Sequence, residues 1–544
     1  MDIEAIVHYL NHGHDVYVLC TRTWCLPQPV LDLADDILSL PRFDEAAFLS
    51  ACQSFYDLDT PPKLNENNDW IANVTPMDFL INSQVDPAEV TTAIRHTVEM
   101  RLARYTPGDH LDLADLWGIG KVKEWAEGLV KDIQLAKTGR MPWSECDDRK
   151  ILIGQYGVGK RTLVGAIAHT AGIRLVEFSA SRWAAAEDGI NHGVARLYAD
   201  FQEALTAAPA IFFIHDMDVF ADMPWTPLLP YFLECLEGIG SQDQLLIIAG
   251  ALTADNVRFE LRHQGRLEEC LLVPSPNAQA LSKMYAVMLR NIPHTLTPVE
   301  LNRLGRLSLG LGEHEVGLIV RRAERKARKE NQRPLTCEDI TSLLIQERYG
   351  TRAESGHWPM TEEELRNTAY HEAGHTILQL MRTRNASLDF ASVIPREDGK
   401  LGFIVPSVDE TRHSLTRQDL IETIRVWLAG RAAEEVLAGK EAVTSGCSND
   451  LYHATRCLQF LLTGSGLESL LMLNRDFEHD QGLCDRAEEI LRQEYTHVLA
   501  TLRKHRKLLD QVAQLLIDRQ EVSGEELMDL YRKYQTNHPG PVNP

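Results

Sequence analysis

The sequence of 544 residues lacks the features that mark several other classes of protein. No apolar run approaches the ~20 residues that a membrane-spanning helix needs, so we expect no membrane span. The first residues, MDIEAIVHYLNHGHD, have neither the basic start nor the apolar core of a secretory signal. The ten cysteines form no C-x-x-C pair, which argues against a disulfide framework or a cysteine zinc site. We therefore expect a soluble cytoplasmic protein with reduced thiols.

Positive charge is also scarce. There are 55 Lys and Arg residues against 78 Asp and Glu, for a net charge of −23, which argues against nucleic acid as a partner. The basic run at residues 321–329 is interrupted by Glu324, and we interpret it as the solvated face of a helix. The length exceeds what one core organises and predicts three or four domains.

Among the residues that are present, His371, Glu372 and His375 point to a metal site. Histidines four apart on a helix project from one face, so both imidazoles can hold one Zn²⁺ while Glu372 takes a proton from a metal-bound water. Thr361 and Glu364 have the spacing of a capping box, which predicts a helix with the motif in its interior. The alternative is a chance match on an ordinary surface helix.

A glycine loop at residues 154–160 (GQYGVGK) follows one apolar strand candidate and opens a helix. Such a loop turns backbone N–H groups toward phosphates and its lysine toward the terminal ones. The pattern asks for Ser or Thr at position 161 to bind Mg²⁺, but Arg161 stands there and Thr162 comes one place late. One hypothesis is that Arg161 replaces Mg²⁺ as a positive charge. The candidate loop residues are Gly157, Gly159, Lys160, Arg161 and Thr162.

The strand candidates at residues 150–153, 210–214 and 245–249 alternate with helices, which predicts a parallel sheet covered on both faces. Other dispersed segments are residues 115–118, 207–214, 394–396, 401–403, 429–435 and 444–450. In this order they resemble the FtsH family, in which an AAA+ ATPase module is fused to a zinc metallopeptidase. The resemblance implies an α/β AAA+ fold (a parallel-sheet P-loop NTPase core with a helical lid), then a mainly α-helical zinc metallopeptidase domain.

The expected domains start with an N-terminal domain of unknown role, residues 1–107, which we predict to be a small α/β domain. A strand is expected at residues 16–20 and a helix at 31–40; the domain is either a decayed fragment of a second ATPase-like fold or an unrelated adaptor. The remaining parts are the AAA+ large α/β subdomain (108–276), the AAA+ helical lid (277–352), the zinc metallopeptidase domain (358–535) and a tail (536–544).

The resemblance supplies a third zinc ligand, Asp450, beside His371 and His375, and makes Glu372 the base. Two imidazoles and one carboxylate leave a fourth position for water. Taken alone, Asp450 suits a helix N-cap equally well.

Two further features of the peptidase part stay open. Glu434 and Glu435 either hold the histidines or are ordinary helix-surface acids. Residues 401–405 are either a strand at the rim of the cleft that accepts an extended substrate or a core strand.

The ATPase-like part departs from the family pattern. His215 and Asp216 stand where the family ends its Walker-B strand with Asp-Glu, and they suit neither Mg²⁺ binding nor water activation as well. The sensor asparagine falls at Leu252, the aromatic pore residue falls within residues 189–191, and Arg266 is a candidate arginine finger. We expect weak or absent ATP hydrolysis, with ATP or ADP as candidate ligands and little support for Mg²⁺.

The sequence thus predicts a zinc-dependent metalloendopeptidase that cleaves unfolded or flexible proteins and peptides. Its ATPase-like module would act as an assembly ring or gate, and the resemblance implies a homo-oligomer, by analogy a hexamer. Two alternatives are an active ATP-dependent zinc protease and a non-catalytic scaffold or chaperone-like protein.

Overall fold

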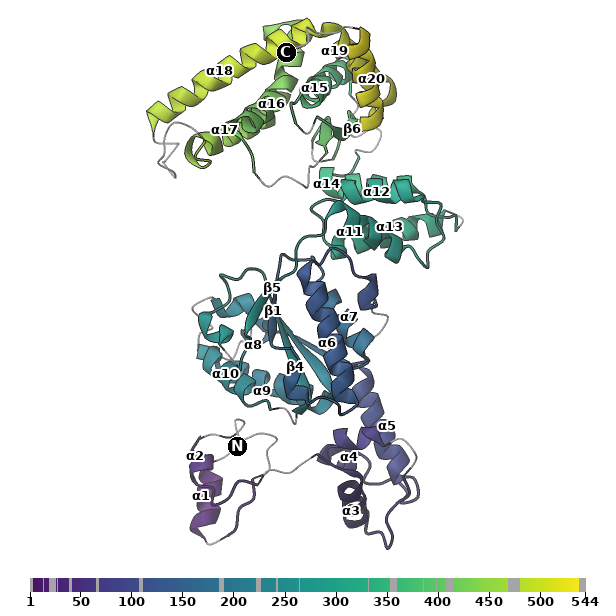
Figure 1. The fold of residues 1–544 in the computed structure, drawn as a ribbon, viewed down its shortest axis with the longest axis vertical. Helices are drawn as coiled ribbons and strands as arrows, with labels where there is room; N and C mark the ends of the chain where they lie inside the picture. Colours follow the sequence, from purple (N-terminus) through teal and green to yellow (C-terminus); the bar gives the residue numbers. More distant parts are fainter. Residues whose placement is uncertain are drawn as a thin grey trace. The chain divides into compact units, whose positions relative to one another are not determined.

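The computed structural model describes most of the chain (Figure 1). The described residues form two compact units, Met1–Pro276 with Gly310–Glu315, and Asn277–Leu309 with Val316–Pro544. The described ranges are 3–12, 14–18, 26, 28–38, 42–64, 68–106, 111–184, 190–221, 227–240, 243–263, 265–330, 332–352, 360–384, 386–397, 399–407, 414–467 and 480–537.

A parallel five-stranded sheet in the order β2-β3-β4-β1-β5 organises the first unit. Its central strands are apolar except for Lys150 at the start of β1 and His215 at the end of β3, because both faces of the sheet are buried. The predicted parallel sheet is confirmed. The strands are β1 (Lys150–Ile153), β2 (Arg174–Ser179), β3 (Ala210–His215), β4 (Leu245–Ala251) and β5 (Glu269–Leu272).

Alternate residues of the strands build two separate cores, one on each face of the sheet. Phe213 belongs to the core shared with α6 and α7, whereas Phe212 belongs to the core shared with α9 and α10. Figure 1 shows these two pairs of helices beside the sheet. The helices of this part are α6 (Lys121–Lys137), α7 (Lys160–Ala171), α8 (Ser181–Ala184), α9 (Ile190–Ala207) and α10 (Leu229–Glu237).

The regular elements of the N-terminal segment are all helices among its described residues, with loops between them, so the predicted α/β character of residues 1–107 is wrong there. Residues 16–18 form no strand, and residues 19 and 20 lie outside the described part. Tyr17 is 87% exposed, and no described strand of this segment offers a partner, which an isolated strand needs. The helix expected at 31–40 ends at Asp32. The helices are α1 (Ile3–Asn11), α2 (Gln28–Asp32), α3 (Glu45–Tyr56), α4 (Pro76–Ile81) and α5 (Val90–Ala103).

The helices α3 to α5 share the core of the ATPase-like sheet. Phe48 and Val98 lie in the same buried cluster as Phe212. The Asn73 amide donates to the carbonyl of Ala208 at 2.6 Å, at the base of β3. This segment is therefore built into the first unit and does not form a core of its own.

The second unit begins with four helices, α11 to α14, and continues with the peptidase helices α15 to α20 and a small antiparallel sheet in the order β7-β6-β8. Capping boxes start α12, α14, α15 and α16, which explains where these helices begin. The bounds are α11 (Ala278–Met288), α12 (Pro298–Leu307), α13 (Glu313–Lys329), α14 (Cys337–Tyr349), α15 (Glu362–Leu380), β6 (Leu388–Ser392), β7 (Phe403–Pro406), α16 (Arg417–Ala438), α17 (Ser448–Thr463), α18 (Gln481–Lys504), α19 (Arg506–Arg519), β8 (Glu521–Ser523) and α20 (Gly524–Asn537).

Short 3-10 helices join these elements, and no helix among the described residues is both long and apolar enough to cross a membrane. They are η2 (Asp69–Asn73), η3 (Leu113–Asp115), η4 (Trp143–Glu145), η5 (Met217–Ala221), η8 (Phe259–Arg262), η9 (Lys440–Ala442) and η10 (Ser445–Cys447).

Candidate metal centre and nucleotide loop

Helix α15 carries the two histidines of the candidate metal centre. It starts at Thr361, whose side chain accepts from the Glu364 N–H while the Glu364 carboxylate accepts from the Thr361 N–H at 2.8 Å. His375 and Glu372 lie in the middle of the helix and are buried, each 5% exposed. A buried helix with a fixed start holds its side chains in one position, as a metal site requires.

The two histidines converge with Asp450 from the first turn of α17. The Nε2 atoms of His371 and His375 are 3.0 Å apart, and the Asp450 Oδ2 lies 2.9 Å and 3.2 Å from them. The N-cap of α17 is Cys447, so Asp450 sits inside the helix and is not its N-cap. Three such ligand atoms within 4.8 Å of one another can hold one metal ion.

The outer nitrogen of each histidine is held by a second partner. His371 Nδ1 lies 2.6 Å from Glu434 Oε1, and His375 Nδ1 lies 2.6 Å from the Val426 carbonyl oxygen, both on α16. Such bonds fix the ring orientation and aim both Nε2 atoms at one point. Burial acts to raise the pKa of Glu434, but hydrogen bonds from His371 and Thr444 lower it overall and keep it a carboxylate. The other candidate, Glu435, accepts from the Tyr495 hydroxyl instead.

Glu372 is a buried carboxyl group with an unused oxygen. Its Oε2 has no hydrogen-bond partner among the described residues. Burial raises the pKa of Glu372, while the neighbouring His371 and His375 oppose that rise. A Cβ built on Gly402 would lie 2.7 Å from Glu372 Oε1, so the chain entering edge strand β7 passes directly over this group. A carboxyl group with a raised pKa beside a metal site suits a general base.

The space between the ligand atoms is kept open by Gly430 on α16. A Cβ on Gly430 would lie 2.3 Å from His371 Nε2 and 2.6 Å from His375 Nε2. Only glycine leaves this position clear. Two imidazole nitrogens, one carboxylate and an unpaired acid beside them are the donor set of a zinc hydrolase, so these residues fit Zn²⁺.

The glycine loop of the first unit adopts the shape that its sequence predicts. Gly157 and Gly159 have φ values of 77° and 99°, a region that favours glycine, and α7 begins at Lys160. The Lys160 ammonium donates to the loop's own carbonyl oxygens at Gly154 and, at 3.1 Å, Gln155.

The two residues that follow the lysine point to different partners. The Arg161 guanidinium pairs with Glu177 on β2 at 2.6 Å, so its charge is already balanced in this structure. Thr162 is hydrogen bonded to the Glu313 side chain.

Comparison with known proteins decides the family. Residues 359–530 match "Peptidase family M41", and residues 150–275 match "ATPase family associated with various cellular activities (AAA)". The chain is 24% identical over 454 residues to the "ATP-dependent zinc metalloprotease FtsH" of Caulobacter vibrioides, covering 78% of this chain and 72% of the relative. It is 25% identical over 450 residues to "ATP-dependent zinc metalloprotease FtsH 3" of Petrotoga mobilis, covering 77% and 68%. The chain belongs to the FtsH family. Zn²⁺ is accordingly its cofactor, in agreement with the donor set described above.

The Walker-B end of this FtsH-family chain forms a small polar cluster. His215 Nδ1 lies 2.9 Å from Asp216 Oδ2, which also accepts from the Ser179 hydroxyl at 2.5 Å. Sequence reasoning missed Asp218, whose carboxylate accepts from the Leu252 N–H at 3.0 Å. The sequence signal that could have found Asp218 is its position, two residues after Asp216 at the end of the Walker-B strand.

The other nucleotide-site candidates lie apart from this cluster or outside the described residues. Arg266 pairs with Glu237 at 2.6 Å and donates to the Glu260 carbonyl oxygen. Gly189, in the segment aligned with the pore, lies outside the described residues.

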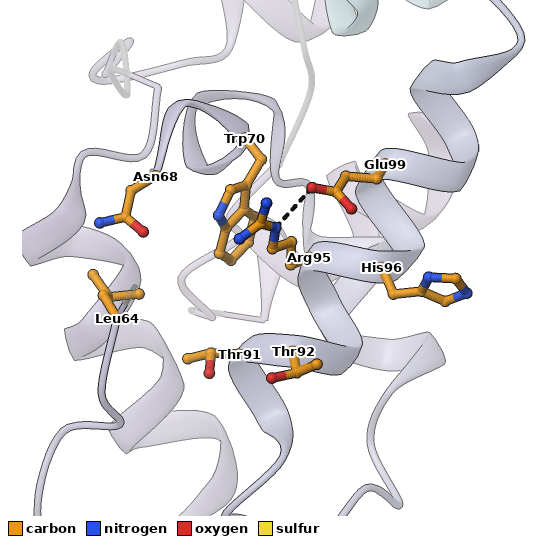
Figure 2. Close-up of a pocket in the computed structure, with 8 residues that line it drawn as sticks. All are labelled: Leu64, Asn68, Trp70, Thr91, Thr92, Arg95, His96 and Glu99. Carbon is orange, nitrogen blue, oxygen red and sulfur yellow. Dashed lines mark hydrogen bonds and ion pairs between the residues drawn. The ribbon is translucent and has the colours of Figure 1, made fainter. Parts of the chain in front are cut away.

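A cavity of about 260 Å³ opens in the N-terminal segment between α5 and η2 (Figure 2). Arg95 and Glu99, both on α5, form an ion pair at 2.7 Å across its lining, while the His96 ring points away. The charges of the lining therefore balance each other. Its residues are Leu64, Asn68, Trp70, Thr91, Thr92, Arg95, His96 and Glu99.

Proposed function

We propose that this chain is a zinc-dependent metalloendopeptidase whose ATPase-like module binds nucleotide weakly and hydrolyses it slowly or not at all. One observation carries the peptidase assignment. Two oriented histidines and Asp450 bring their ligand atoms together beside Glu372, a buried acid with an unused oxygen.

The residues divide the work as follows. His371 and His375, through Nε2, and Asp450, through Oδ2, would hold the zinc, and Glu434 with the Val426 carbonyl would fix the imidazoles. Bound zinc lowers the pKa of a coordinated water toward ~7.

Glu372 would accept a proton at Oε2 and later deliver it to the nitrogen of the leaving amine. Its burial favours the protonated form, which makes the acceptance of that proton favourable.

The ATPase-like module lacks several groups that hydrolysis uses. Arg161 replaces the Mg²⁺-binding hydroxyl and is tied to Glu177, while His215 and Leu252 replace a carboxylate and an amide. Without a strong power stroke, the substrates would be unfolded or flexible chains.

This proposal also includes an oligomeric ring and a cytoplasmic location. Its domain bounds are 108–276, 277–352 and 358–535.

The first test replaces Glu372 by glutamine in the full chain. We expect one zinc per chain to remain, measured by plasma mass spectrometry, and casein cleavage to fall by about 100-fold or more because proton transfer is lost. Glu363→Gln, an exposed position on the same helix, is the control and should leave both values unchanged. Unchanged cleavage by E372Q would refute the assignment, and a zinc-loaded but inert wild type would favour the scaffold.

A second candidate function is an active ATP-dependent protease. It is favoured by the intact Gly157, Gly159 and Lys160 and by relatives named as ATP-dependent. Phosphate release that disappears in Lys160→Ala would support it against our proposal.

A further inference from the structure

The segment Gly310–Glu315, which ends in the first turn of α13, lies against the glycine loop and groups with the first unit. The Glu313 N–H donates to the Gly157 carbonyl oxygen at 2.8 Å. A Cβ on Gly312 would lie 2.4 Å from the same oxygen, so this position tolerates only glycine. The two backbones are therefore packed as closely as the chain allows.

Two carboxylates come with this segment. Glu313 Oε2 lies 2.9 Å from the point where a Cβ of Gly159 would stand, and it is hydrogen bonded to Thr162. Glu315 Oε2 lies 3.4 Å from the corresponding point of Gly157 and accepts from the Gly312 N–H. Both acids thus flank the glycines that the loop pattern assigns to phosphate binding.

The cations of the loop do not compensate these acids. Lys160 is bound by the loop carbonyls of Gly154 and Gln155, and Arg161 is paired with Glu177. Burial lowers the pKa of Lys160, against the opposing effect of Asp218 and Asp216, so the ammonium is less favourable here than in water. Glu313 is half-buried, and this burial raises the pKa of its carboxyl group, against the effect of the Thr162 hydrogen bond.

We propose that Glu313 acts as an internal anion that closes the glycine loop against nucleotide polyphosphates. This inference rests on the proposed weak nucleotide binding and gives it a structural cause. A phosphate brought to Gly159 and Thr162 would meet a like charge within a few ångströms in a partly desolvated site, where repulsion is much stronger than in water. ATP or ADP enters the loop only if the segment Gly310–Glu315 moves away.

The test measures nucleotide affinity directly in the full-length chain. Fluorescence anisotropy with a labelled ATP, competed by unlabelled ATP and ADP with and without Mg²⁺, gives Kd for each variant. We expect Glu313→Ala to tighten binding by about ten-fold or more, because it removes the repelling charge. Glu313→Gln keeps an acceptor for Thr162 and should tighten binding in the same direction.

The control is Glu338→Ala, which removes an equal charge from the exposed first turn of α14 and should leave Kd unchanged. Adding Lys160→Ala to Glu313→Ala should abolish the gain, because the gain depends on the loop. No tightening in either Glu313 variant overturns the inference, whether wild-type binding is tight or undetectable.

Casein cleavage and phosphate release in the same samples separate this inference from the proposed function. Rapid wild-type ATP hydrolysis would refute the weak module, whatever Glu313 does. Slow ATP hydrolysis combined with an unchanged Kd in both Glu313 variants would refute the proposed closure by Glu313 and leave the proposal of a weak ATPase-like module standing. Circular dichroism confirms folding, and the isosteric Glu313→Gln keeps the test decisive if the alanine variant unfolds.

Discussion

Gly430 leaves open the space between the ligand atoms of the metal centre, because it has no side chain. Replacing it by alanine places a methyl group 2.3 Å and 2.6 Å from the two Nε2 atoms, so the imidazoles must rotate away from their common point. We expect zinc content and casein cleavage to fall together. Gly128→Ala in α6 is the matched control: a Cβ there meets no atom within 4 Å, and the helix should gain about 0.5–1 kcal/mol. Full zinc occupancy in G430A would contradict the geometry.

Asp148 gives the first unit a pH-dependent stability. Burial raises the pKa of Asp148 to about 6, against the Ile247 N–H and the charge of Arg149. The folded state therefore keeps a proton that the unfolded state releases near pH 4. The contribution of Asp148 to stability is thus highest below that pH and is lost as the pH rises through about 6. Asp148→Asn should remove this loss and add about 3 kcal/mol to the free energy of unfolding at pH 7. The free energy of unfolding in urea, measured between pH 4.5 and 7.5 for the wild type and for Asp148→Asn, checks this prediction. The same pH dependence in both proteins would contradict it.

Residue roles were predictable from the sequence only when local spacing or a family pattern carried them. The spacing of His371 and His375 predicts a shared face, but Asp450 lies far along the chain and came from the resemblance. Sequence reasoning left Glu434 undecided, and the contact with His371 is a feature of the fold. Glu313 was missed because its closeness to the glycine loop exists only in three dimensions.

At the scale of elements, the close crossing of α15 and α16 supports the site. A Cβ on Gly374 would lie 2.4 Å from the Ala429 carbonyl oxygen and 2.7 Å from the Ala433 Cβ. Gly374→Ala should force the helices apart, cost about 1–3 kcal/mol and release zinc, measured by urea unfolding and metal analysis. Thr361→Ala is the comparison: it loses the cap of α15 at a cost of about 1 kcal/mol but should keep its zinc. Equal zinc loss in both variants would show that zinc binding depends only on the stability of the fold and not on the crossing of α15 and α16.

Elements were predictable where burial dictates the sequence. Strands β1, β3 and β4 are buried on both faces and therefore appear as continuous apolar runs. The short apolar run at residues 16–20 has the same local character, yet residues 16–18 form no strand because strand formation needs a paired neighbour. Local pattern does not supply that information.

At the scale of the whole molecule, the metal centre and the closed nucleotide loop predict proteolysis that is uncoupled from ATP. An unstructured casein chain should be cleaved at the same rate with and without ATP, because Glu372 and the zinc ligands need no nucleotide. A folded domain with a disordered tag should lose the tag and keep the domain, since the module that we propose supplies no strong power stroke to unfold it. A zinc chelator should stop both reactions, and added zinc should restore them. Gel analysis of both substrates measures these outcomes, and ATP-dependent degradation of the folded domain would show that the weak-module proposal is wrong.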